Sequence, residues 1–170
     1  MVRKRPKNIM PAVLCVIIAV ATLVVQTAVS GLIAVRGVAP VMLVTCAAVS
    51  AVYLGDSGGT LMGGLCGLMM DALVPDVRVW IYTALLAVLC GIVGDVSAYA
   101  NRSRMATSFF WSGAVLIAVG LMETRVFGGI RGGGALNCLV TAGIQTVYSL
   151  IFVVPFDFMF KGIERRREKV

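Results

Sequence analysis

Long uncharged stretches fill most of the chain and divide it into six parts. Runs without Asp, Glu, Lys or Arg cover residues 8–35, 37–55, 57–70, 79–94, 105–122 and 132–156. A helix that crosses a bilayer needs about 20 apolar residues. The first, second, fifth and sixth runs are close to that length or exceed it. The third and fourth become long enough only if Asp71 and Asp95 belong to their helices.

This pattern predicts an all-α, polytopic membrane protein with six transmembrane helices. We expect them near residues 10–34, 38–55, 58–75, 79–99, 105–126 and 135–160. The connections between the first four are very short, so we expect a single integral-membrane domain, residues 1–170, with basic tails at 1–9 and 161–170. The first run is too long for the core of a cleaved signal peptide, and no small-residue cleavage site stands out.

The basic residues predict the orientation. Eleven of them lie before the first predicted helix, between the fourth and fifth, and after the sixth: Arg3, Lys4, Arg5, Lys7, Arg102, Arg104, Lys161, Arg165, Arg166, Arg167 and Lys169. With an even number of helices these segments share one side, and the other side holds only Arg36, Arg78, Arg125 and Arg131. The positive-inside rule therefore places both termini in the cytoplasm.

Composition supports the same class of protein. The chain is 59% hydrophobic and 14% charged, with a mean hydropathy of +0.97, whereas a soluble domain needs far more polar surface. The net charge is +7 and histidine is absent. Because the positive charges gather at the ends of the apolar runs, we interpret them as topology signals that also meet anionic lipid, and we predict no nucleic-acid binding.

A row of glycines marks the third predicted helix. Gly59, Gly63 and Gly67 recur every four residues, and the next step reaches Asp71. Four residues advance a helix by about 400°, so these positions form one slowly turning stripe. Small residues let helices approach closely, and close packing drives helix association in lipid. We interpret this glycine row either as packing between helices of the chain or as a surface for a partner's helix.

Asp71 needs its own explanation, because a charge at the bilayer centre costs roughly 3 kcal/mol on insertion scales. It lies about one helical turn from the outer boundary that Pro75, Asp76 and Arg78 indicate. Three interpretations stay open at this point. They are contact with a partner, a proton site, and an ion pair with Arg36, Arg78 or Arg125.

The sequence shows no catalytic set. Asp71 and the Asp95 of GIVGD (91–95) lack the glycine spacing of intramembrane aspartyl proteases, and a hairpin would separate their depths by about 20 Å. Without histidine, serine and cysteine nucleophiles lose their usual base. The cysteines at 15, 46, 66, 90 and 138 form no CxxC, so we interpret them as small apolar residues. The loop FGGIRGGGALN (127–137) lacks the lysine and hydroxyl of a phosphate loop. We predict no enzyme activity, metal or cofactor.

The last predicted helix carries a polar seam. Its members follow helical spacing and are Asn137, Thr141, Gln145, Tyr148 and Ser149. Polar side chains in lipid face neighbouring helices or another protein. Hydrogen bonds within the bundle, a ligand path and a partner contact are therefore all open. Gln26 is the only other glutamine and also lies mid-membrane, which fits such a seam.

The segment RGVAPVMLVTCAAVSAVYLGDSGGTLMGGLCGLMMDAL (36–73) resembles the MreD family of rod-shape-determining membrane proteins. The resemblance consists of a proline that opens the second helix, a short turn, and G-x-x-x-G-x-x-x-D in the third. Pro40 takes the position of the proline, and Gly63, Gly67 and Asp71 take those of the motif. The chain departs from the family after this point, where VPDVRVW (74–80) replaces the usual proline-leucine-glycine turn.

The resemblance implies a non-enzymatic scaffold in the bacterial inner (cytoplasmic) membrane, within the complex that elongates the cell wall. MreD proteins act with MreC, a single-span protein with an extracytoplasmic domain. The complex also contains the filament MreB, the glycosyltransferase RodA and a class B penicillin-binding transpeptidase. On this basis we predict that the glycine row or the polar seam binds the membrane helix of MreC. Whether the protein forms a homodimer stays open.

Two other functions fit the sequence. The general plan is similar to the S-components of energy-coupling-factor vitamin transporters, in which the polar seam and Asp71 would line a pocket that opens outward. Such subunits usually have more tryptophan than the Trp80 and Trp111 seen here, and both of these also suit interfacial anchoring. A small channel or proton-coupled carrier is the third candidate, and it would require acidic residues deeper in the membrane.

Overall fold

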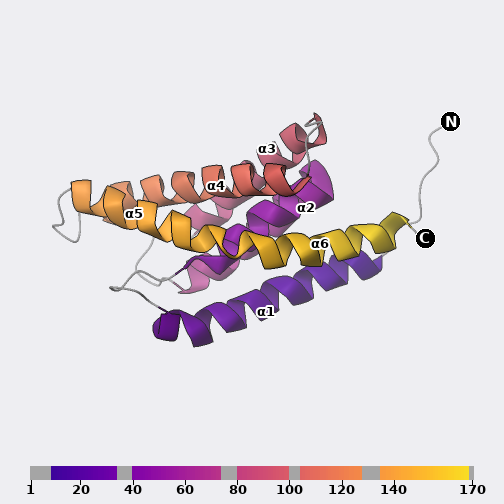
Figure 1. The fold of residues 1–170 in the computed structure, drawn as a ribbon, viewed down its shortest axis with the longest axis horizontal. Coiled ribbons are helices and arrows are strands. Elements are labelled where there is room, and N and C mark those ends of the chain that lie inside the picture. Colours follow the sequence, from indigo (N-terminus) through magenta and orange to yellow (C-terminus); the bar gives the residue numbers. More distant parts are fainter. Residues whose placement is uncertain (1–8, 34–39, 74–79, 100–103, 128–134, 169–170) are drawn as a thin grey trace.

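The computed structural model describes residues 9–33, 40–73, 80–99, 104–127 and 135–168 (Figure 1). These residues form helices only, with no strand among them, which confirms the predicted all-α class. The helices are α1 (Ile9–Ile33), α2 (Met42–Leu73), α3 (Ile81–Tyr99), α4 (Arg104–Phe127), α5 (Ala135–Leu150) and α6 (Val153–Glu168).

The helix α2 reverses direction at Gly55. A straight helix would separate residues 51 and 59 by about 12 Å, yet a methyl group built on Gly59 would lie 3.0 Å from the Cβ of Ala51. Gly55 has φ 76° and ψ −172°, a conformation open essentially only to glycine. The first arm (42–54) and the second arm (56–73) therefore lie side by side. They correspond to the predicted helices 38–55 and 58–75.

The first arm of α2 is the centre of the molecule. Every residue from 40 to 53 is buried, and α2 contacts each of the other helices. A helix that is hydrophobic all round is one that neighbours surround. This explains the composition of VMLVTCAAVSAVY (41–53), in which small and apolar side chains occupy every face.

The last predicted helix, 135–160, is two helices in the structure. α5 ends at Leu150, α6 begins at Val153, and their axes are bent by 44°. Pro155 accounts for the break, because it has no N–H to donate to the carbonyl of Ile151 and its ring crowds that carbonyl. α6 then continues to Glu168. The helix thus extends beyond the end predicted near 160, because the Glu and Arg residues that follow are good helix formers.

Successive helices run back and forth along one axis. Gly59 and Gly67 of the second arm meet Cys90 and Thr83 of α3, so these helices are antiparallel. α4 is likewise antiparallel to the α5–α6 pair, because Gly120 meets Ala142 and Ser108 bonds to Asp157. The beginning of α1 and the end of α6 lie at the same end of the bundle (Figure 1).

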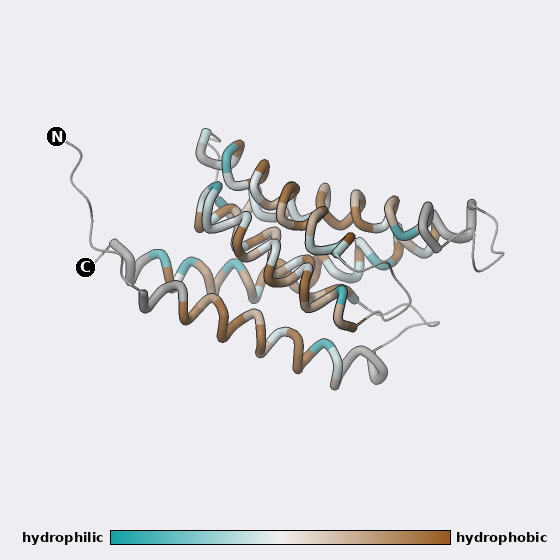
Figure 2. Tube along the Cα trace, turned by 180° about the vertical axis from the view of Figure 1, so that it is seen from behind, coloured by the Kyte–Doolittle hydropathy of each residue, from teal (hydrophilic) through white to brown (hydrophobic). Residues whose placement is uncertain are grey.

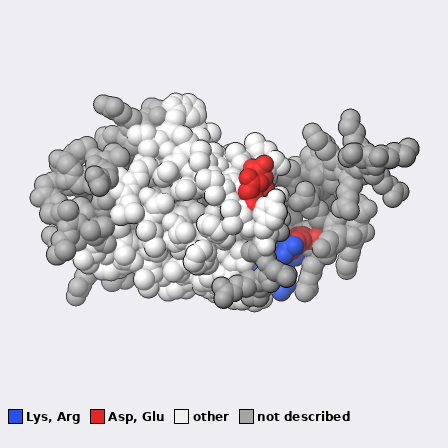
Figure 3. All heavy atoms as spheres, turned by 90° about the horizontal axis from the view of Figure 1, so that it is seen from above, with Lys and Arg blue, Asp and Glu red and all other residues white. Residues whose placement is uncertain are grey.

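Hydrophobic residues recur along the described helices (Figure 2), and each of these helices carries exposed large apolar side chains, such as Val24, Leu61, Val88, Phe110, Val147 and Phe158. On the face seen in Figure 3, the described acidic and basic residues gather toward one end. By length and composition, α2 and α4 can cross a membrane, and the bent pair α5–α6 would add a third span. The reversal at Gly55 divides α2 into two arms. In α1 and α3 the apolar part of the helix is shorter, Val13–Ala28 in α1 and Ile81–Ser97 in α3. These features indicate a membrane protein.

Candidate functional site

The glycine row packs directly against the backbone of α3. A methyl group on Gly59 would lie 2.7 Å from the carbonyl oxygen of Cys90, and one on Gly63 would lie 2.4 Å from that of Leu86. On Gly67 it would lie 2.6 Å from both the Cα of Thr83 and the carbonyl oxygen of Tyr82. Contacts this close leave no room for a side chain. The absence of side chains at these three positions therefore lets the backbones of the second arm and α3 come into contact.

The helix that packs on the glycine row is α3. Gly59, Gly63 and Gly67 are all buried within the chain. A partner's helix would have to displace α3 to reach them. The structure thus shows packing between the chain's own helices at this face.

Asp71 caps the amino terminus of α3. Its Oδ1 accepts the backbone N–H of Tyr82 (3.1 Å), and its Oδ2 accepts both the N–H (2.9 Å) and the hydroxyl (2.6 Å) of Thr83. The first N–H groups of a helix have no partner inside it. Trp80, which precedes α3, has φ 80° and carries no side-chain acceptor. A carboxylate from the neighbouring helix takes that role instead, and the positive end of the helix dipole favours its charge.

A second acidic residue belongs to the same end of the bundle. The hydroxyl of Tyr82 donates to Oε1 of Glu123 on α4 at 2.9 Å. The first turn of α3 is therefore bonded to Asp71 of the second arm and, through Tyr82, to Glu123 of α4. Of the basic residues expected to pair with Asp71, Arg36 and Arg78 lie outside the described residues, as does the side chain of Arg125. Asp95 lies about 18 Å farther along α3 than Thr83, so it stands far from Asp71.

The beginning of α2 is capped in the same way. The Oε1 atom of Gln26, on α1, accepts the N–H of Leu43 at 2.9 Å. The Oγ atom of Ser149, on α5, accepts the N–H of Val41 at 2.9 Å. Gln26 was expected in a polar seam inside the bundle. In the structure Gln26 does face the bundle, where it bonds to the backbone at the start of the buried first arm.

The polar seam of α5 does not face one way. Ser149 points into the bundle, Gln145 and Tyr148 are half-buried, and Thr141 is exposed. The side chain of Asn137 lies outside the described residues. The predicted seam is therefore split between an inward end at Ser149 and an outward part near Thr141.

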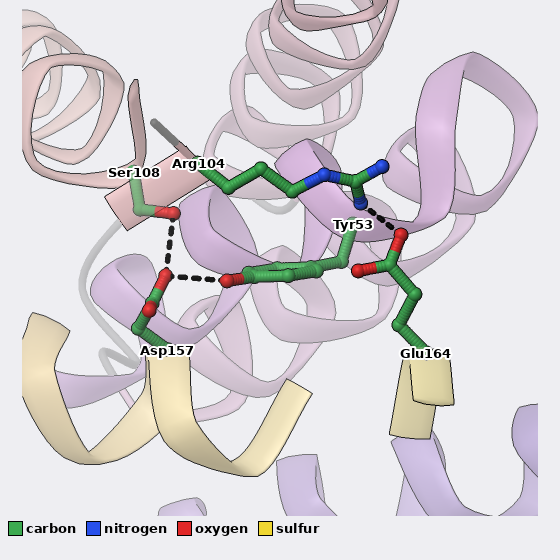
Figure 4. A network of polar contacts seen from close by, with 5 residues as sticks. All are labelled: Tyr53, Arg104, Ser108, Asp157 and Glu164. Atoms are coloured by element: carbon green, nitrogen blue, oxygen red, sulfur yellow. Dashed lines mark hydrogen bonds and ion pairs between the residues drawn. The ribbon is translucent and has the colours of Figure 1, made fainter. Parts of the chain in front are cut away.

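A buried polar network that sequence analysis missed lies at the end of the bundle where α6 ends (Figure 4). Asp157 of α6 is 4% exposed, and its Oδ1 accepts the hydroxyls of Tyr53 at 2.7 Å and Ser108 at 2.9 Å. Arg104 forms an ion pair with Glu164, and its guanidinium carbon lies 5.8 Å from the centre of the Tyr53 ring. The network joins the first arm of α2, α4 and α6.

The sequence held a signal for this network. Asp157 and Glu164 are two helical turns apart, on the same face of α6 as Val153 and Phe160, both of which are buried. An acid at a core position of an amphipathic pattern indicates a buried partner. From the sequence, Asp157 only ends the uncharged run 132–156, and Arg104 is interpreted only as a topology signal.

Three cysteines meet in the shared core of α2 and α3. Cys46, Cys66 and Cys90 come from the first arm, the second arm and α3, and each is 0% exposed. All are free thiols, as is the buried Cys15. The described residues contain no group of three or more His, Cys, Asp or Glu arranged to hold a metal ion.

Comparison with known proteins assigns no relative to this chain. No family model, no curated protein and no solved structure matches it.

Proposed function

We propose that this chain is a non-enzymatic membrane scaffold of the MreD type, which binds MreC in the rod complex of the bacterial inner membrane. The observation that supports the proposal is that the residues of the family-like pattern act together. Gly63 and Gly67 admit α3, Asp71 caps α3, and Pro40 precedes the buried first arm. A motif whose members all serve helix packing suits a protein that works by holding others in place.

The surface for MreC then lies outside the glycine row. Of the two faces predicted from the sequence, the polar seam of α5 is accessible in part, at Thr141. Gly143 is not a member of the seam, but it is also exposed on α5, beside the exposed apolar residues Val140, Ile144 and Val147. A methyl group on Gly143 would meet no atom within 4 Å. A small residue flanked by apolar ones on an outer helix face suits close approach of a second membrane helix.

Co-purification tests this proposal. The tagged full-length protein is purified in mild detergent with MreC from the same host co-expressed, and the retained MreC is measured. We expect wild type to retain it and Gly143→Leu to lose most of it, because the longer side chain holds the partner helix away. Ala21→Leu is the matched control, since Ala21 is also a small exposed residue but lies on α1.

Each outcome has a definite meaning. Loss in Gly143→Leu with retention in Ala21→Leu locates the surface on α5. Retention in both variants removes the α5 surface, although the scaffold proposal stands. No retention by wild type contradicts the scaffold proposal. A small molecule bound to that wild-type preparation would favour the vitamin-transporter subunit instead.

A further inference from the structure

The joint between α5 and α6 is a weak point of the backbone. Across it, the N–H of Phe152 donates to the carbonyl of Ser149 at 3.1 Å, and the N–H of Phe156 reaches the carbonyl of Phe152 at 3.4 Å. Pro155 offers no N–H to the carbonyl of Ile151. The bend is the kink that a proline causes, and the backbone here lacks one of the bonds that stiffen a continuous helix. We call residues 151–155 the hinge.

The two sides of the hinge are held differently. On the α5 side, Ser149 is tied to the buried first arm: its Oγ accepts the N–H of Val41 at 2.9 Å, and its carbonyl lies 3.5 Å from the hydroxyl of Thr45. This end is therefore anchored to the most buried part of the molecule. Motion about the hinge would move α6 and leave α5 in place.

On the α6 side, the contacts converge on Tyr53. Its hydroxyl donates to Asp157, and its ring stacks on Phe160 with centroids 6.4 Å apart and planes 18° from parallel. Arg104 of α4 lies against the same ring. One side chain of the first arm thus contacts both α6 and α4 (Figure 4).

These contacts form an outer and an inner layer. The Arg104–Glu164 pair is accessible, with 56% and 23% of the two side chains exposed, so salt or another charged molecule can compete for it. The bonds from Tyr53 and Ser108 to Asp157 are buried, and no solvent can replace them. We call Tyr53, Ser108 and Asp157 the latch.

We propose that α6 is a hinged arm, that residues 151–155 are its pivot, and that the latch holds it against the bundle. The position of the charged end of α6, from Lys161 to Glu168, is then set by the latch. A charged molecule that takes Arg104 or Glu164 removes the outer layer. The latch is then the remaining polar tie on α6, beside the apolar packing of Val153, Phe156, Phe160 and Ile163. The inference rests on contacts within this chain, and it does not depend on MreC as the partner.

Hydrogen exchange of the full-length protein in lipid nanodiscs tests the latch. Tyr53→Phe keeps the ring that stacks on Phe160 and removes the hydroxyl that Asp157 accepts. We expect amides of residues 157–164 to exchange about tenfold faster, which corresponds to about 1.4 kcal/mol, while those of α5 do not change. Tyr99→Phe is the matched control, because Tyr99 is 89% exposed and belongs to α3.

The same experiment can overturn the proposal. Unchanged exchange in α6 would show that the latch does not hold it, and an equal increase in all helices would show a general loss of stability. A second variant tests the hinge. Pro155→Ala restores a donor to Ile151, so adding it to Tyr53→Phe should return exchange of 157–164 toward the wild-type rate. If the double variant exchanges as fast as Tyr53→Phe alone, residues 151–155 are not the pivot.

Discussion

At the scale of single residues, polar side chains from neighbouring helices complete two helix starts among the described residues. Asp71 caps α3, and Gln26 and Ser149 cap the start of α2. In a membrane, a helix that starts inside the bundle has no water to satisfy its first N–H groups. A side chain from a neighbouring helix must then do so. This accounts for an acid at the end of the glycine row without any ligand.

We predict that Asp71→Asn destabilises the protein. Asparagine offers one oxygen and an NH₂ group where the carboxylate offers two acceptors, so at least one donor of α3 loses its partner. The free energy of unfolding should fall by about 1–3 kcal/mol, measured by SDS or thermal unfolding of the protein in detergent. Asp95→Asn is the control, because Asp95 is exposed at the other end of α3. Equal effects of the two substitutions would contradict the capping role.

At the scale of helices, the second arm of α2 packs closely against α3 because its glycines have no side chains. Gly63 approaches the carbonyl oxygen of Leu86, whereas the adjacent Gly64 faces Ala87 at an ordinary van der Waals distance. Backbone atoms cannot move aside as a flexible side chain can. The same small step from glycine to alanine should therefore have opposite consequences at these neighbouring positions.

Gly63→Ala should lower the stability by about 1–3 kcal/mol, because the two helices must separate to admit the methyl group. Gly64→Ala should be neutral or stabilising by up to about 1 kcal/mol, since alanine is the better helix former and its Cβ would lie 3.8 Å from that of Ala87. The thermal midpoint of the two variants in the same detergent distinguishes them. A loss of similar size in both would argue against the close contact with Leu86.

At the scale of the whole molecule, exposed basic residues mark one level of the bundle and an exposed tryptophan marks another. The apolar stretch of α4 from Arg104 to Glu123 has 20 residues and is about 28 Å long, close to the hydrocarbon thickness of a bilayer. Arg104 and Lys161 are exposed at the end where α6 terminates, and Trp80 is exposed at the other end. These levels are where we expect the membrane surfaces.

Cysteine labelling in spheroplasts tests the orientation that the basic residues predict. We expect Trp80→Cys to react with a membrane-impermeant maleimide added outside, and Gly162→Cys to react only after permeabilisation. Both are made with Cys138 replaced by serine; Cys15, Cys46, Cys66 and Cys90 are buried. The reverse pattern would place the termini outside, and labelling of both from outside would exclude a bundle that spans the membrane.

Much of the architecture followed from the sequence alone. The apolar runs and the short polar breaks located the helices, and Gly55 lies at the predicted end of the helix 38–55. Periodicity placed Gly59, Gly63 and Gly67 on one face, and composition indicated a membrane protein. These inferences succeeded because they depend on local patterns, in which the spacing of small and apolar residues determines which face of a helix can be buried.

Only the tertiary structure decided which helix each polar residue serves. The sequence could not show that the glycine row packs on α3, that Asp71 caps that helix, or that Asp157 bonds to Tyr53 and Ser108. It also missed the break at Ile151, because the apolar pattern continues through Pro155. Such pairings join residues far apart in the chain. Periodicity carries no information about which distant donor and acceptor meet, and the packing of all the helices together determines it.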